Sequence, residues 1–130
     1  MPTLIVTASA VFLIVLGGVL NFAPAEVAVR LGMVGVPQSA VVLQLLAGAL
    51  LALGVVNWMQ RRSISGIYGR PAGMGNMLFF SVCAFSLLRA ANAGVMPELT
   101  WGLGVITALF AAGFIWLVFM SSPVPVKGAC

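Results

Sequence analysis

The chain has 130 residues, of which 62% are hydrophobic and only 6% are charged. A water-soluble domain needs far more polar surface, so this composition excludes an ordinary soluble protein. The net charge of +4 and the pI near 10.1 would suit a nucleic-acid-binding protein. However, the positive charges lie between apolar runs, where they indicate membrane topology, and we expect no nucleic-acid partner.

Four apolar runs fill most of the chain. They lie at about residues 4–20, 40–58, 76–94 and 101–120. Each has about 17–20 residues, which is the length a helix needs to cross a hydrocarbon core of ~30 Å at ~1.5 Å per residue. The sequence therefore predicts an all-α membrane protein with a single domain over residues 1–130, in which four transmembrane helices pack as a bundle.

The first run has a second interpretation as a signal peptide, because Ala23-Pro24-Ala25 resembles a cleavage site. No positive charge precedes this run, and it exceeds the usual signal-peptide core of about 7–15 residues. We therefore predict that it is retained as a membrane span. The connection that follows, at about residues 21–39, is predicted to be a loop or a short interfacial helix.

Small residues recur at helical spacing in several spans, and small residues let helix backbones approach closely in a membrane. The predicted packing positions in spans one, two and four are Gly18, Gly48, Gly104, Ala108 and Ala112. Two alternatives are open for these positions. They form either the inner contacts of a four-helix bundle or the contact between two copies of the chain.

The second connection, at about residues 59–75, is rich in glycine and contains Pro71, so it is predicted to be a turn-rich loop. Its arginines, Arg61, Arg62 and Arg70, are candidates for contact with lipid headgroups. A polar cluster at one membrane face contains Asn57, Arg61, Arg62, Tyr68 and Asn76, and its simplest role is helix capping together with lipid-headgroup contact. The glycines lack the Lys-Ser/Thr ending of a nucleotide-binding loop.

The distribution of positive charge predicts the orientation. Arg61, Arg62 and Arg70 share a side with Lys127 in the tail when the number of spans is even, whereas the opposite side carries Arg30. Because cytoplasmic loops carry the excess of arginine and lysine, we expect both termini to be cytoplasmic in a bacterial inner membrane.

Arg89 is the least ordinary residue, because it lies within the third predicted span. A charge at the bilayer centre costs at least about 2.5–3.5 kcal/mol, and less toward the edge. Residues that could share an outer polar cluster with it are Glu26, Glu98, Gln44, Asn92 and Asn21. Arg89 either reaches the interface or forms a structural ion pair, or the cluster binds an anionic or polar ligand.

Groups that support catalysis or metal binding are sparse. The chain has no histidine, no pair of carboxylates within one span, and two isolated cysteines, Cys83 and Cys130. Haem, zinc and di-iron sites need His, Cys or carboxylate ligands in larger numbers. We therefore expect no cofactor, no metal, no disulfide and no enzymatic activity. General acid–base chemistry would have to use Glu26, Glu98, Tyr68 or a thiol.

The first half of the chain resembles the DoxX-like proteins, a broad group of small bacterial four-span proteins. The resemblance covers roughly residues 14–62, and it is carried by Gly17-Gly18-Val19-Leu20-Asn21-Phe22-Ala23-Pro24-Ala25-Glu26, Gly35-Val36-Pro37, Leu45-Leu46-Ala47-Gly48 and Gly54-Val55-Val56-Asn57-Trp58-Met59-Gln60-Arg61. It implies a four-helix bundle, often of unassigned activity, and some such proteins are associated with thiol-redox or respiratory complexes. This chain has no Cys-x-x-Cys pair.

The leading functional hypothesis is an accessory or structural subunit of a larger membrane complex or of a homo-oligomer. Its partners would be membrane lipids and either another membrane protein or a second copy. The alternative is a small carrier or binding protein for a lipid-like or anionic compound that uses the cluster around Arg89. A membrane enzyme that acts on a lipid is the third option.

Overall fold

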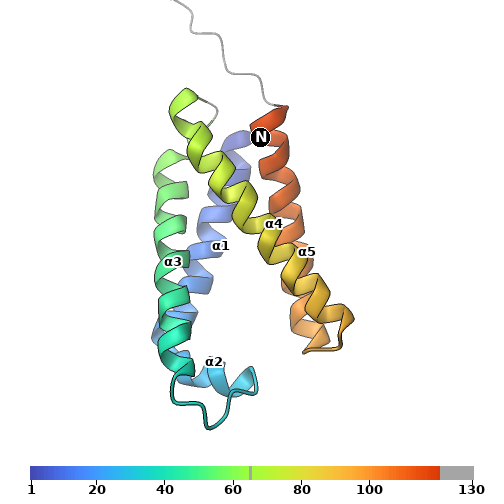
Figure 1. The fold of residues 1–130 in the computed structure, drawn as a ribbon. Helices are drawn as coiled ribbons and strands as arrows, with labels where there is room; N and C mark the ends of the chain where they lie inside the picture. The colour runs from blue at the N-terminus through green and yellow to red at the C-terminus, as the bar shows by residue number, and fades with distance from the viewer. Residues whose placement is uncertain (65, 121–130) are drawn as a thin grey trace, which may run out of the picture. The chain divides into compact units, whose positions relative to one another are not determined.

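The structure is a computed structural model, and it describes residues 1–64 and 66–120. Its elements are α1 (Pro2–Phe22), α2 (Pro24–Arg30), α3 (Ser39–Gln60), the 3₁₀ turn η1 (Ile67–Gly69), α4 (Arg70–Asn92) and α5 (Pro97–Phe119) (Figure 1). The described part of the chain contains no strand, so the all-α prediction is confirmed. Lys127 and Cys130 lie outside the described residues.

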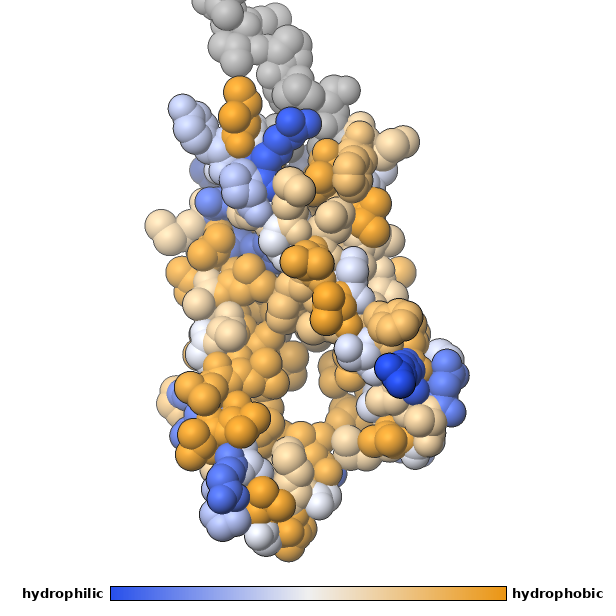
Figure 2. All heavy atoms as spheres, in the orientation of Figure 1, coloured by the Kyte–Doolittle hydropathy of each residue, from blue (hydrophilic) through white to orange (hydrophobic). Residues whose placement is uncertain are grey.

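Helices α1, α3, α4 and α5 have the length and composition of membrane spans. They contain 21, 22, 23 and 23 residues, and at ~1.5 Å per residue each exceeds a hydrocarbon core of ~30 Å. Apolar surface covers the middle of the helices, and hydrophilic residues gather toward their ends (Figure 2). The chain is therefore a small multi-pass membrane protein. The connection between α1 and α3 contains the short helix α2. The sequence had predicted either a loop or a short interfacial helix for this segment.

The start of α4 corrects the predicted loop at residues 59–75. The helix begins at Arg70, so Gly73 and Gly75 are helical, not part of a turn. Pro71 occupies the first turn, where its missing N–H costs no hydrogen bond. Gly73 is buried, and a Cβ added there would lie 3.3 Å from Val118 Cγ2. The glycine that suggested a turn therefore serves the packing of α4 against α5.

The helices form two compact units. One comprises Val6–Met59, and the other comprises Met1–Ile5 with Gln60–Cys130. In the first unit, α1 and α3 run antiparallel, and α2 lies across one end of the pair (Figure 1). In the second unit, α4 and α5 form an antiparallel pair that follows the η1 turn.

Small residues spaced seven apart bring α1 and α3 together. Ala10 and Gly17 on α1 face Gly54 and Ala47 on α3, and all four are buried. A Cβ added to Gly17 would lie 3.1 Å from the Ala47 carbonyl oxygen, and one added to Gly54 would lie 3.3 Å from the Ala10 carbonyl oxygen. The two backbones are thus nearly in van der Waals contact. A seven-residue period is that of a left-handed helix pair.

Aromatic side chains form the centre of the α4·α5 contact. Phe80 and Phe114 are fully buried, and their ring centroids are 5.7 Å apart in a stacked arrangement. The ring of Phe110 lies 5.0 Å from Phe80. Farther along the pair, Gly104 packs against Leu88, whose Cδ2 would be 2.9 Å from an added Cβ.

Candidate functional site

The most deeply buried polar pair links α1 to α3. Asn57 Nδ2 donates a hydrogen bond to Ser9 Oγ at 3.1 Å, and both side chains are fully buried. Ser9 Oγ in turn donates to the Val6 carbonyl oxygen at 2.8 Å. Because an amide in an apolar interior loses its contacts with water, this bond favours one arrangement of the two helices. Asn57 was a predicted capping residue, whereas no role was predicted for Ser9.

Other buried polar side chains bond to the backbone of their own helix. Asn76 is fully buried and donates to the Ala72 carbonyl oxygen at 2.8 Å. The hydroxyls of Thr100 and Thr107 donate to carbonyl oxygens four residues earlier at 2.9 and 2.8 Å. These bonds satisfy the hydroxyl protons without any ligand. Among the described residues, Gln60 Oε1 is buried without a hydrogen-bond partner.

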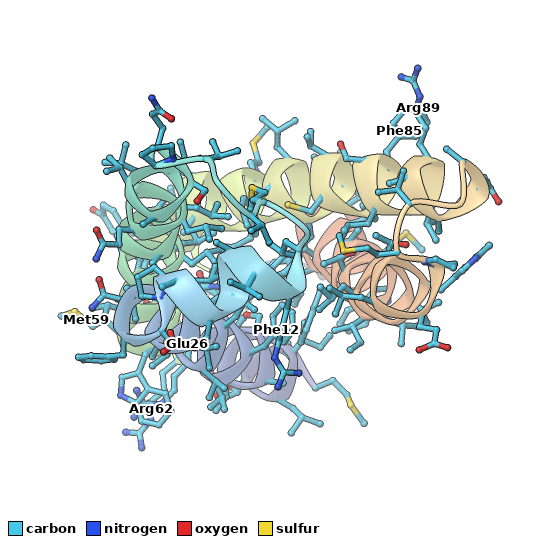
Figure 3. All side chains as sticks on the ribbon, turned by 90° about the horizontal axis from the view of Figure 1, so that it is seen from below. Phe12, Glu26, Met59, Arg62, Phe85 and Arg89 are labelled. Atoms are coloured by element: carbon cyan, nitrogen blue, oxygen red, sulfur yellow. The ribbon has the colours of Figure 1, made fainter. Side chains whose placement is uncertain are left out.

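Arg89 lies on the outside of the α4·α5 pair. It extends from the same side of α4 as Phe85, away from α5 (Figure 3). Its guanidinium makes no hydrogen bond or ion pair with another described residue. Glu98 and Asn92 are also exposed near this end of the pair. The structure therefore brings these three residues to one end of the unit without pairing Arg89 with Glu98.

The end of α4 lies close to Arg89. The helix ends at Asn92, three residues later, which is only about 4.5 Å along the helix axis. A long arginine side chain spans that distance and reaches the interface. A positive charge in the last turn also interacts favourably with the helix dipole. Arg89 thus needs no buried partner to be tolerated.

The other predicted members of the outer cluster belong to the first unit. Glu26 is exposed on α2, and Gln44 is exposed in the second turn of α3. Asn21 is partly exposed near the end of α1. All three lie near the same end of the α1·α3 pair. Glu26, like Glu98, makes no ion pair with a described residue.

The predicted packing residues differ in their surroundings. Gly104 is buried in the α4·α5 contact, Ala108 is partly buried and Ala112 is exposed. Gly18 and Gly48 have no atom within 4 Å of an added Cβ. The glycines that make the close contact are Gly17 and Gly54, as described above. Gly17 lies seven residues after Ala10, and Gly54 lies seven residues after Ala47. This spacing, which occurs in both helices, was the sequence signal that could have identified the contact.

The described residues offer few groups for a metal or for catalysis. They contain no group of three or more His, Cys, Asp or Glu side chains that could hold a metal ion. Cys83, on α4, is a free thiol and is partly buried. Comparisons with protein families, with curated proteins and with solved structures found no match for this chain. The resemblance to DoxX-like proteins stays a prediction.

Proposed function

We propose that the protein is an accessory or structural subunit that packs within the membrane against a larger membrane protein or a second copy of itself. The observation that carries this proposal is Gly48. It lies in the middle of α3, it is exposed, and no atom lies within 4 Å of the position of an added Cβ. Glycine inside a helix costs about 1 kcal/mol relative to alanine.

Within its own unit, Gly48 makes no packing contact that would offset this cost, because other residues of α3 form the contact with α1. Ala52 lies one turn farther along the same side of α3 and is also exposed. Small residues four apart on a membrane helix let a second helix approach closely. The outward side of α3 is therefore suited to receive a helix of a partner.

The test is Gly48→Leu, with the protein extracted gently from its own membranes and analysed by native mass spectrometry. We expect the partner or the second copy to be lost, because the leucine fills the space needed for close approach. The α1·α3 contact is unaffected by this change, so the substitution should keep or slightly raise the stability of the isolated protein.

Ala49→Leu is the matched control, since it adds a leucine one residue away and about 100° around the helix. It should retain the complex. A complex that survives Gly48→Leu contradicts the proposal. So does a lowered melting temperature of the monomer, because Gly48 would then pack against another helix of its own chain.

A binding or carrier role at Arg89 is the second candidate. What supports it is the exposed guanidinium, which no described residue neutralises. In this role Arg89→Ala removes a bound anionic compound and leaves the melting temperature unchanged. Retention of the compound in the variant would exclude Arg89 as its anion site.

We also propose that the protein resides in a bacterial inner membrane with both termini in the cytoplasm. The proposal is supported by three arginines, Arg61, Arg62 and Arg70, in or beside the connection between α3 and α4. The connections at the opposite ends of the spans carry one positive residue, Arg30.

A further inference from the structure

The turn between α3 and α4 combines positive charge with exposed apolar surface. Arg62 and Arg70 are exposed, and Arg62 extends away from the helices (Figure 3). Ile67 is 80% exposed and Tyr68 is 92% exposed, whereas Ile64 is buried. The turn therefore buries one apolar side chain and leaves Ile67 and Tyr68 exposed in the same segment as two exposed arginines.

Gly69 fixes the shape of this turn. A Cβ added there would lie 2.5 Å from the carbonyl oxygens of both Ser63 and Ile64, and it would also overlap the Ile64 Cα. These are backbone atoms, which cannot move aside without opening the turn. Only glycine fits this position. The glycine therefore allows residue 69 to lie in close contact with the backbone of residues 63 and 64.

This contact places the two exposed arginines near each other. Arg62 precedes Ser63 and Arg70 follows Gly69, so each is one peptide unit, ~3.8 Å, from the contact. Two long, planar guanidinium groups can then approach the same anion.

No acidic residue occurs between Glu26 and Glu98 in the sequence. The guanidinium groups of Arg62 and Arg70 make no hydrogen bond or ion pair with a described residue. Each guanidinium carries five N–H donors and matches the geometry of a phosphate group. The turn thus presents positive charge that the described protein does not neutralise.

The turn joins two helices that cross the membrane, so it lies at the membrane surface whichever way the protein is oriented. Helix α4 is about 35 Å long and exceeds the hydrocarbon core by about 5 Å, which puts its first residues at the depth of the headgroups. Tyrosine is enriched at this depth because one end of its ring is apolar and the other is polar.

We propose that this turn binds the phosphate headgroup of an anionic phospholipid. Arg62 and Arg70 contact the phosphate, and Ile67 and Tyr68 reach the boundary between the headgroups and the acyl chains. This site is separate from the outward side of α3 and does not depend on the accessory role proposed above.

The test measures binding of phosphatidylglycerol and phosphatidylcholine to the purified full chain in detergent, by native mass spectrometry. The variant Arg62→Gln/Arg70→Gln should bind phosphatidylglycerol about thirty-fold more weakly, since each arginine near an anionic headgroup contributes about a five-fold factor. Binding of phosphatidylcholine should not change. Arg30→Gln is the control, because it removes an exposed positive charge on α2, outside the turn, and should keep full binding.

Gly69→Ala separates the shape of the turn from its charge. It keeps both arginines but forces the turn open, so we expect phosphatidylglycerol binding to fall at least five-fold. If this variant does not fold, the two arginine variants alone decide. Full binding by Arg62→Gln/Arg70→Gln, or an equal loss in the control, would overturn the proposal. Glycerol phosphate bound as tightly as phosphatidylglycerol would also overturn it, because the exposed apolar residues would then contribute nothing.

Discussion

Single residues matter most where a polar group is buried between two helices. Ser9 and Asn57 are each fully buried, and they share one hydrogen bond between α1 and α3. Such bonds between membrane helices contribute about 0.6 kcal/mol on average and up to about 1.7 kcal/mol. The bond therefore stabilises the pair modestly, and it selects one arrangement of the two helices among similar apolar contacts.

A double-mutant cycle with Ser9→Ala and Asn57→Ala measures this bond. We expect a coupling energy of about 0.5–1.5 kcal/mol in the free energy of unfolding, determined by denaturation in mixed micelles. Asn57→Ala alone should cost more than Ser9→Ala, because Asn57 makes a further interaction in the structure. Strictly additive effects would show that the 3.1 Å contact contributes nothing to stability.

Residue types alone could not predict which partner each polar group has. Asn57 was visible in the sequence as a polar residue near a span end, but its partner Ser9 lies 48 positions earlier. The span that contains Arg89 was predicted to begin six residues late, because glycines 73 and 75 suggested a loop. The depth of a charged residue in the membrane depends on where both ends of its helix lie, whereas a local sequence pattern indicates only one of these ends.

The helix pairs show the difference between neighbouring glycines most clearly. Gly17 faces α3, where an added Cβ would lie 2.9 Å from Leu51 Cγ and 3.1 Å from two backbone atoms. Gly18 is the next residue, and an added Cβ there meets nothing within 4 Å. One glycine permits the contact between the helices, and its neighbour only lowers the intrinsic stability of α1.

Gly17→Ala and Gly18→Ala should therefore change stability in opposite directions. We expect Gly17→Ala to destabilise the protein by about 1–3 kcal/mol, because backbone atoms of α3 cannot give way. Gly18→Ala should stabilise it by about 0.5–1 kcal/mol through helix propensity. Melting temperatures in detergent compare the two variants directly, and equal effects would contradict the contact assigned to Gly17.

A second matched pair lies on α5. Gly104 is buried against Leu88, whereas Gly102 has no atom within 4 Å of an added Cβ. Gly104→Leu should lower the free energy of unfolding by about 1–3 kcal/mol, because it overpacks the α4·α5 contact. Gly102→Leu should be neutral or slightly stabilising. Thermal unfolding followed by circular dichroism would check both, and a tolerated leucine at position 104 would show that the pair can separate without cost.

The sequence predicted the existence and type of the four long helices because apolar length is a strong signal. It did not predict which faces of α1 and α3 are in contact. A glycine lowers helix propensity equally on either face, so composition and spacing within one helix do not distinguish Gly17 from Gly18. The distinction appears only when the seven-residue spacing of α1 is matched with that of α3, which requires knowing that these two helices pair.

At the scale of the whole molecule, each compact unit is built around helices that are consecutive spans. The α1·α3 contact and the α4·α5 contact each join neighbours in the chain, so each pair can form soon after its helices enter the membrane. In membranes, helices first become stable individually and then associate. The turn at residues 61–69 connects these two pairs. Its positive charge can determine on which side of the membrane the turn lies.

The orientation gives the last prediction. A fluorescent protein fused to the C-terminus should be active and a fused alkaline phosphatase inactive, since the latter folds only outside the cytoplasm. Replacing Arg61, Arg62 and Arg70 with glutamine removes the charge difference between the two sides, and we expect a mixture of both orientations with activity from both reporters. Arg89→Gln is the control, because it removes a positive charge at the opposite side and should leave the orientation as it is. If the triple variant keeps one orientation, the helices themselves and not these arginines determine it, and lipid binding would then be the remaining role for Arg62 and Arg70.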